Sequence, residues 1–221
     1  MHPLAQVLRS AAEGRFPPVD GGAEIMPPDA AGAHAVVAFT GHSYLLTDLD
    51  PTDLARFRPD GYGAAAHPRL LVHLAGAGGG IGSHDVVLVR RGAAGVTSLA
   101  DRTDLEDHPR VQRARHHRRD VRVIGDERGF VTIGSGLVDR AEMSVELTAS
   151  EPGRGAGRDL ITDALRVFDS DEFVFAQVAP GNAASLRAFL ASGFVPIGSE
   201  VIIESGCRSA VDEGDRVAHV G

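Results

Sequence analysis

The stretch EMSVELTASEPGRGAGRDLITDALRVF, residues 142–168, changes its pattern midway. Its first part, Glu142 to Leu147, alternates polar with apolar residues, which is typical of a half-buried strand. Its last part has the apolar spacing of a helix that begins near Gly155 and runs to Phe168. Glycines in the connecting turn leave backbone N–H groups uncovered at a helix N-terminus, where the helix dipole favours negative charge. The stretch therefore predicts a strand, an anion-binding turn and a helix.

The turn itself, from Gly153 to Gly157, admits two interpretations. Arg154 and Arg158 add charges that can reach phosphates, so the turn could hold a pyrophosphate. A tight strand-to-helix connection would use the same glycines. A dinucleotide-binding fold would need Gly-x-Gly-x-x-Gly here and a P-loop would need Gly-Lys-Ser/Thr, and the turn has neither pattern.

The segments around this stretch extend the pattern to an alternation of strands and helices. Three strand-like segments joined by short turns precede the first helix, and a strand, a second helix and one or two closing strands follow it. The strand-like segments are Val121–Ile124, Gly129–Ile133, Glu142–Leu147, Phe173–Val178 and Phe194–Ile203, and the second helix is Ala183–Ser192, which Gly193 would terminate. The order β-β-β-α-β-α-β indicates an α/β fold.

Residues 1–120 carry no motif that assigns a role. Residues 14–32, with four prolines among glycines, are expected to form a loop or linker, and Gly76–Gly82 a flexible loop. The segments expected to be regular are a weak helix at Pro3–Glu13, a strand at His34–Thr40 with a hairpin partner at Tyr44–Thr47, helices from Pro51, at Pro68–Ala75 and from Pro109, and a strand at Asp85–Val89.

The glycine turn resembles a motif of a known family. GCN5-related N-acetyltransferases (GNAT) carry Arg/Gln-x-x-Gly-x-Gly/Ala directly after their fourth strand. Here Gly155-Ala156-Gly157 fits the glycine positions, and Leu160-Ile161 fits the apolar pair that follows. The first position is Pro152, which removes one side chain and one backbone donor. This departure predicts weaker phosphate binding, for which Arg154 could compensate.

A second motif is similar to the same family. It reads Asn182-Ala183-Ala184-Ser185-Leu186-Arg187-Ala188-Phe189-Leu190-Ala191-Ser192-Gly193-Phe194, and its spacing from the Asn to the Gly-Phe pair matches the family throughout. The two motifs stand in the family's order and separation. The resemblance covers roughly residues 121–203. It implies a GNAT-like α/β fold with a mixed, mostly antiparallel sheet flanked by helices, to which an additional N-terminal α/β lobe is joined.

The resemblance also implies a division of the chain and a function. Residues 1–120 would form the N-terminal lobe on the acceptor side, 121–205 the acetyl-CoA-binding core and 206–221 a tail. The implied reaction moves an acetyl group from acetyl-CoA, a co-substrate, to a primary amine of a small molecule or peptide by direct attack on the thioester. The implied coenzyme contacts are Val145, Leu147, Gly153, Arg154, Gly155, Ala156, Gly157, Arg158, Asn182, Ser185 and Phe189.

Candidate catalytic residues lie on the predicted strand Glu142–Leu147. Glu142 is the candidate base, because the resemblance places a Glu at the start of the fourth strand. Ser144 and Glu146 share its face, since side chains alternate along a strand. The same pattern also fits a strand that is only solvated on this side.

Phe189 occupies the position at which the family usually has a general-acid Tyr, and Phe cannot donate a proton. We expect the thiolate to leave with the help of water. Alternatives are that Tyr44 enters from the first lobe or that the protein is a non-catalytic acyl-CoA-binding regulatory module, which the departure at Pro152 also favours.

The composition makes some classes of binding partner less suitable. The net charge of −8 disfavours nucleic acid as a partner. No stretch is long and apolar enough to predict a membrane span, and no signal peptide is evident, so a cytoplasmic location is expected. All 22 basic residues are Arg, and with 27 Gly this usage is typical of GC-rich bacterial coding. The single Cys207 excludes an internal disulfide. A homodimer is left open.

A basic run in the helix from Pro109 contains His116 and His117 between arginines. A solvated helix face is one interpretation, and a clamp for an acidic acceptor or for the coenzyme's 3′-phosphate is the other. Adjacent residues on a helix are expected to point apart, so no metal site is predicted.

Overall fold

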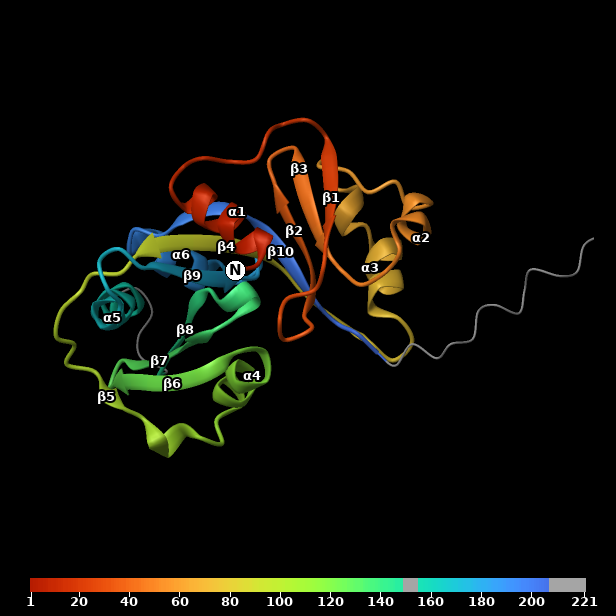
Figure 1. The fold of residues 1–221 in the computed structure, drawn as a ribbon. Helices are drawn as coiled ribbons and strands as arrows, with labels where there is room; N and C mark the ends of the chain where they lie inside the picture. The colour runs from red at the N-terminus through yellow and green to blue at the C-terminus, as the bar shows by residue number, and fades with distance from the viewer. Residues whose placement is uncertain (149–154, 207–221) are drawn as a thin grey trace, which may run out of the picture.

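The computed structural model describes residues 1–148 and 155–206. In this part of the chain, ten strands form one sheet in the order β1-β3-β2-β10-β4-β9-β8-β7-β6-β5 (Figure 1). The strands are β1 (Gly22–Met26), β2 (His34–Phe39), β3 (His42–Leu46), β4 (Gly80–Arg91), β5 (Ala100–Asp101), β6 (Arg119–Asp126), β7 (Gly129–Ser135), β8 (Ala141–Leu147), β9 (Phe173–Val178) and β10 (Val195–Glu204).

Helices connect and cover these strands (Figure 1). The α-helices are α1 (Pro3–Ala12), α2 (Pro51–Ala55), α3 (Pro68–Ala75), α4 (Pro109–His117), α5 (Ala156–Ala164) and α6 (Ala183–Ala191). The short 3-10 helices are η1 (Ala64–Ala66), η2 (Thr103–Leu105), η3 (Leu137–Asp139) and η4 (Leu165–Val167). Among these described helices, none combines the length and apolar character that a membrane crossing requires.

The predicted fold class is confirmed. The sheet is mixed and mostly antiparallel, since only the β1–β3 and β8–β9 pairs of the described strands are parallel. From residue 119 onward the elements follow the predicted order, and Phe194–Ile203 contributes one strand, β10. Helices begin where the sequence predicts caps: the Asp50 carboxylate accepts a hydrogen bond from the Thr52 N–H at 2.8 Å, directly before Pro51.

Strands β8 and β9 separate shortly after they meet. They pair only at Ala141 with Val174 and at Glu142 with Phe175, although β8 continues to Leu147 and β9 to Val178. Beyond these pairs the two strands leave backbone groups on their facing edges without a partner from each other. Unpaired backbone N–H and C=O groups need another partner, so this position in the middle of the sheet is suited to a ligand.

One face of the sheet around β8 and β9 is apolar and covered by α5 and α6. Met143 and Val145 of β8 join Leu160, Phe189 and other side chains in one buried cluster. The two helices approach each other closely at Gly157, where an added Cβ would lie 3.2 Å from the Ala188 Cβ. Burial of this cluster is the main source of stability for the half of the sheet that contains β8 and β9.

The opposite face is covered by α1 and α4 at different places. Leu4 and Leu8 of α1 pack against Val87 and Phe175 in a second buried cluster, and Val111 of α4 packs against strands β6 and β7. Between these two coverings the face carries charged side chains, which form the candidate site described below.

Strands from both sides of residue 120 alternate in the sheet. Strand β4, from the N-terminal part of the chain, lies between β10 and β9. On its other edge β10 pairs with β2. The N-terminal α/β elements and the C-terminal strands therefore share one sheet, in which β10 and β4 are interleaved between β2 and β9.

Two predictions of loops are wrong in part. Residues 14–32 contain strand β1, which pairs in parallel with β3, and Gly80–Gly82 opens strand β4. The physical reason is close contact with neighbours that are distant in sequence. An added Cβ at Gly82 would lie 2.9 Å from the Ile202 carbonyl oxygen, so glycine here serves close strand packing instead of flexibility.

Candidate functional site

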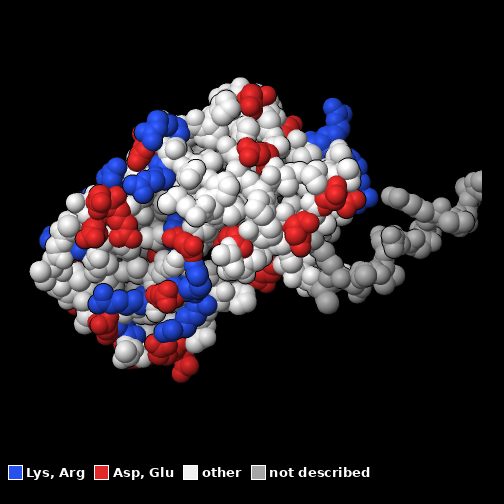
Figure 2. Space-filling model, viewed as in Figure 1, with Lys and Arg blue, Asp and Glu red and all other residues white. Residues whose placement is uncertain are grey.

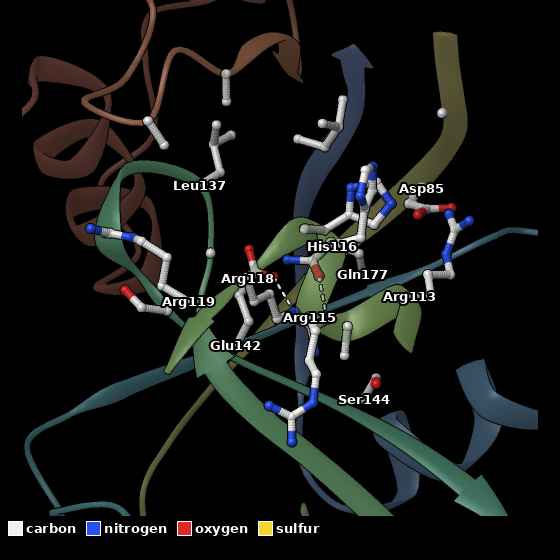
Figure 3. Close-up of a pocket in the computed structure, with 18 of the residues that line it drawn as sticks. Asp85, Arg113, Arg115, His116, Arg118, Arg119, Leu137, Glu142, Ser144 and Gln177 are labelled. Carbon is white, nitrogen blue, oxygen red and sulfur yellow. Dashed lines mark hydrogen bonds and ion pairs between the residues drawn. The ribbon is translucent and has the colours of Figure 1, made fainter. Parts of the chain in front are cut away.

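A cavity of about 330 Å³ opens on the charged face of the sheet. Strands β4, β8, β9 and β10 form its floor, helix α4 forms one wall, and the segments around Asp29 and Leu137 form another. Figure 3 shows Arg118, Glu142 and Gln177 in the middle of this cavity, with Arg119 on one side and Asp85 and Arg113 on the other. Its size is at the lower end of the range for small-molecule sites.

Glu142 is buried and both of its carboxylate oxygens are engaged. Arg118 donates from Nε to Oε2 at 2.8 Å, and Arg140 donates from Nε to Oε1 at 2.7 Å. Burial alone would raise the pKa of Glu142, but the charges and hydrogen bonds of these arginines outweigh it and hold the pKa below its ordinary value. An engaged carboxylate of low pKa is a weak proton acceptor.

Arg140 links Glu142 to a second buried carboxylate, Glu200 of β10. Arg140 donates from Nη2 to Glu200 Oε1 at 2.5 Å, and all three residues are at most 7% exposed. Burial would lower the pKa of Arg140, but the two carboxylates outweigh it and raise the pKa further above its ordinary value, so Arg140 stays charged. This buried ion-pair chain crosses from β8 to β10 beneath the cavity.

Glu200 differs from Glu142 in its surroundings. Burial raises the pKa of Glu200 above its ordinary value; Arg140 acts against this, and the negative charges of Glu142 and Asp85 add to the rise. Its second oxygen, Oε2, is buried and makes no hydrogen bond within the described structure. Glu200 is one of the residues that line the cavity.

Two further buried polar atoms on the cavity floor lack partners within the described structure. They are Asp85 Oδ1 on β4 and Gln177 Nε2 on β9. Buried polar groups without a hydrogen bond cost free energy, so such a concentration at one cavity indicates a place where a ligand or water completes the bonding.

Arg118 covers the position where β8 and β9 separate. Its guanidinium donates to Glu142 and, at 3.3 Å, to Gln177 Oε1 (Figure 3). It also donates to Thr132 Oγ1 at 3.3 Å. Arg118 thus bridges β7, β8 and β9 on the charged face. Because Arg118 donates to Gln177 Oε1, the amide of Gln177 is oriented with its Nε2 left without a partner in the described structure.

The prediction that Glu142, Ser144 and Glu146 share one face of β8 is confirmed. Ser144 Oγ lies 2.7 Å from Thr132 Oγ1, and Glu146 forms an ion pair with Arg110 of α4. Catalytic roles for the three stay predictions. The arginine partners of Glu142 hold its pKa below the ordinary value, so it is less suited to accept a proton than Glu200, whose pKa is raised.

Those residues implied to hold the coenzyme that the structure describes lie on the other side of the sheet from the cavity or at the end of β8. Gly155 has φ +78° and precedes α5 without a capping side chain, and Leu147 lies beside Gly157. Ala156 is the first residue of α5, and the half-exposed Arg158 is paired with Asp159. Gly153 and Arg154 lie outside the described residues.

The described contacts of the second motif, Asn182–Phe194, cap a helix and pack the core. The Asn182 side chain accepts a hydrogen bond from the Ser185 N–H at 3.1 Å and so caps α6. Phe189 is 2% exposed and packs edge-on against Phe194, with ring centroids 4.9 Å apart. Val145 is buried in the same core. Contacts of these residues with a coenzyme stay predictions.

The expectation that His116 and His117 point apart is wrong. They lie in the last turn of α4, their ring centroids are 4.7 Å apart, and both approach Glu204 at the end of β10. His116 Nε2 is 3.0 Å from Glu204 Oε1. Burial, followed by the positive charges of Arg113 and His116, lowers the pKa of His117 and favours its neutral form. The three side chains are close enough for a cation, at the rim of the cavity.

The sequence analysis missed Asp85, Arg140, Gln177 and Glu200 as site residues. One signal was present for Glu200: it is a lone acid within the otherwise apolar and small residues of Val195–Ile203. A charged residue in a buried strand needs a partner and is often functional. No comparable signal marked Asp85 or Gln177.

Comparisons with known proteins give matches only at the level of solved structures. No family model and no curated protein match the chain. A GNAT-family acetyltransferase from Colwellia psychrerythraea is 11% identical, with a TM-score of 0.36, over 57% of this chain and 57% of that one. A GCN5-related N-acetyltransferase from Kribbella flavida is 12% identical, with a TM-score of 0.39, over 66% and 65%.

A third structure, a functionally unknown conserved protein from Staphylococcus epidermidis, is 14% identical, with a TM-score of 0.38, over 80% of this chain and 74% of that one. The chain thus spans 57% and 65% of the length of the first two matched structures. The GNAT-like architecture is visible in the chain's own strand order and in the parting of β8 from β9.

Proposed function

We propose that the protein is an acetyl-CoA-dependent N-acetyltransferase whose acceptor is a primary amine. The observation that carries this proposal is the early parting of β8 from β9. The start of α5 lies beside the end of β8, and a cavity lined by buried carboxylate oxygens without hydrogen bonds in the described structure lies on the opposite face. An extended thioester placed along the parted strands would have phosphates at one end and an amine acceptor at the other.

The start of α5 is suited to the pyrophosphate. Gly155 supplies no side-chain cap, so within the described part of the chain the first N–H groups of α5 remain available, and the dipole of this nine-residue helix adds attraction for an anion. Arg158 in the first turn is half exposed and can turn from Asp159 to a phosphate.

The cavity side is suited to the amine. Glu200 has an oxygen without a hydrogen bond in the described structure, and its pKa lies above the ordinary value, so its carboxylate is better suited than an ordinary Glu to accept a proton from the incoming ammonium. The neutral amine nitrogen then forms a bond to the thioester carbon, the carbon–sulfur bond breaks, and the nitrogen loses its second proton to water to give the neutral amide. The sulfur leaves as thiolate and takes a proton from water, because Phe189 in the core offers none.

Two measurements test this proposal. Titration calorimetry should detect binding of coenzyme A and acetyl-CoA, and release of free thiol with a panel of amines should detect turnover. Arg158→Ala should weaken coenzyme binding several-fold through the lost charge. Arg166→Ala is the matched control, because Arg166 lies in η4, beyond the opposite end of α5.

The outcomes separate the two candidate functions. Absence of coenzyme binding would rule out both the enzyme and the acyl-CoA-binding regulatory module. Binding without turnover of any amine would favour the regulatory module, which the Phe at position 189 motivates. The acetyl group as cargo, the cytoplasmic location and a homodimer are parts of the proposal that separate measurements must address.

A further inference from the structure

We propose that the acceptor amine also carries an anionic group, a carboxylate or a phosphate, and that the cavity binds its two ends separately. The ammonium would bind between Asp85 and Glu200 on the floor, and the anionic group would bind Arg113 on the α4 wall. This inference rests on the proposed function and specifies the substrate class of the same site.

The floor provides a place for an ammonium. Asp85 and Glu200 are register partners across the antiparallel pair of β4 and β10, so their side chains project from the same face of the sheet, about 5 Å apart at Cβ. Asp85 Oδ1 and Glu200 Oε2 are both buried without a hydrogen bond in the described structure. An ammonium has three donors and can satisfy both oxygens at once.

The electrostatics of the floor favour a positive ligand. The charge of Asp85 contributes to the raised pKa of Glu200, which shows that the two carboxylates repel each other. Arg140 is buried and donates to Glu142 and to the other oxygen of Glu200, whereas its Nη1 makes no hydrogen bond within the described structure. A cation bound between Asp85 and Glu200 would reduce the repulsion between them and offset part of the cost of burying Glu200 as a carboxylate.

The α4 wall provides a cation for the other end. Most arginines of this region are neutralised: Arg110, Arg115, Arg118 and Arg119 pair with Glu146, Glu106, Glu142 and Asp139. Figure 2 shows this interleaving of positive and negative side chains over α4. Arg113 lines the cavity and forms no ion pair with any of the described residues.

Arg113 is placed for the acceptor and not for the phosphates of the coenzyme. Gln177, Glu142 and Arg113 belong to the charged face of the sheet, whereas α5 covers the apolar face. In Figure 3, Asp85 and Arg113 lie on the same side of the cavity. One ligand with a short spacer between ammonium and anion would use both.

The test compares amines that differ only in the anionic group. The probes are alanine with ethylamine, 4-aminobutyrate with propylamine, and phosphoethanolamine with ethanolamine. The comparison of carboxylate probes with the phosphate probe shows which anionic group the cavity binds. The different spacer lengths of the probes report the distance between the ammonium site and the anion site. We measure KM in turnover with acetyl-CoA and Kd by calorimetry on the coenzyme A-loaded protein.

We expect at least one anionic probe to bind roughly tenfold or more better than its partner, as a charge-assisted contact predicts. Arg113→Ala should abolish this preference and leave coenzyme A binding unchanged. Arg115→Ala, on the same helix but paired with Glu106, should keep the preference. Asp85→Asn should weaken both members of the pair. Circular dichroism verifies that each variant is folded.

Equal Kd values within every pair, or a preference that survives Arg113→Ala, would overturn the inference while the proposed function stands. The calorimetric arm decides the matter even if none of the probes is turned over. Loss of coenzyme A binding in the unmodified protein would instead contradict the proposed function itself.

Discussion

The two faces of the sheet at β8 and β9 differ in how their side chains are satisfied. On the α5–α6 face, Met143, Val145 and Phe189 are packed in an apolar cluster that needs no specific partner. On the opposite face, Glu142, Arg140 and Glu200 are equally buried but depend on one another for charge compensation. Apolar packing tolerates small rearrangements, whereas a buried ion-pair chain depends on every member.

The difference teaches which face is organised for chemistry. A buried ion-pair chain adds little net stability compared with apolar residues of the same size, because desolvation offsets the attraction. This ion-pair chain lies at the floor of a cavity, next to buried atoms that lack hydrogen-bond partners in the described structure. The apolar face supports the fold, and the charged face holds groups whose proton affinity is shifted in opposite directions, downward for Glu142 and upward for Glu200.

The largest expected effect concerns Glu200. Glu200→Gln removes the proposed base and should lower the rate of acetyl transfer by about a hundredfold to ten-thousandfold. A base works only when it is deprotonated, and the raised pKa of Glu200 shifts its deprotonation to higher pH. The rate of the unmodified enzyme should therefore fall on the acidic side of its pH–rate profile, which we call the acid limb. The variant should lack this limb.

Two further variants decide between the carboxylates of this face. Glu142→Gln should retain the acid limb, since the pKa of Glu142 lies below its ordinary value. Glu24→Gln, on the distant edge strand β1, serves as the control. If Glu142→Gln loses the limb and Glu200→Gln keeps it, Glu142 is the base, as the sequence resemblance implies.

The next effect tests the mutual dependence of the charged face. Arg140→Met should destabilise the protein by about 3–5 kcal/mol, because it leaves buried carboxylate charge uncompensated. The folded state then keeps a proton on Glu200 to a higher pH than the unfolded state does. The loss should therefore grow as pH rises from about 5 to 8. Urea unfolding at several pH values measures it.

A variant in which Arg140, Glu142 and Glu200 are all replaced by apolar residues of similar size is the control for Arg140→Met. It should recover much of the stability that Arg140→Met loses, since no unpaired charge remains in the network. Equal destabilisation of the single and triple variants would show that shape, and not charge, holds this face together.

A smaller effect is expected on the apolar face. Phe189→Tyr places the family's usual acid residue where the side chain is 2% exposed. The added hydroxyl would be buried within an apolar cluster, so we expect a loss of about 1–3 kcal/mol and no gain in rate. Chemical unfolding and thiol-release assays measure the two quantities. A faster enzyme would mean that position 189 reaches the thioester.

The smallest effect compares one glycine from each face. Gly157→Ala presses on the apolar Ala188, but alanine also favours the helix, so the net loss should be about 1 kcal/mol. At Gly136 an added Cβ would lie 2.1 Å from Glu142 Cδ, and Gly136→Ala should cost more by displacing a paired carboxylate. Denaturant midpoints compare them. The reverse order would show that the charged face is the more adaptable one.

Local sequence patterns predicted much of the framework. The Asn182 cap, the termination of α6 at Gly193 and the common face of Glu142, Ser144 and Glu146 follow from interactions within a few residues. These features depend on local backbone geometry, so the sequence contains them directly. Strand β1 escaped prediction because its pairing with β3 joins residues about twenty positions apart.

The sequence by itself determined the order of strands and helices from residue 119 onward and the apolar core of α5 and α6. Only the tertiary structure decided which charges meet. Asp85 faces Glu200 because β4 pairs with β10, and Arg140 reaches both Glu142 and Glu200 because their strands share one sheet. The physical reason is that pKa and hydrogen bonding depend on distance in space, which a linear pattern of residue types does not specify.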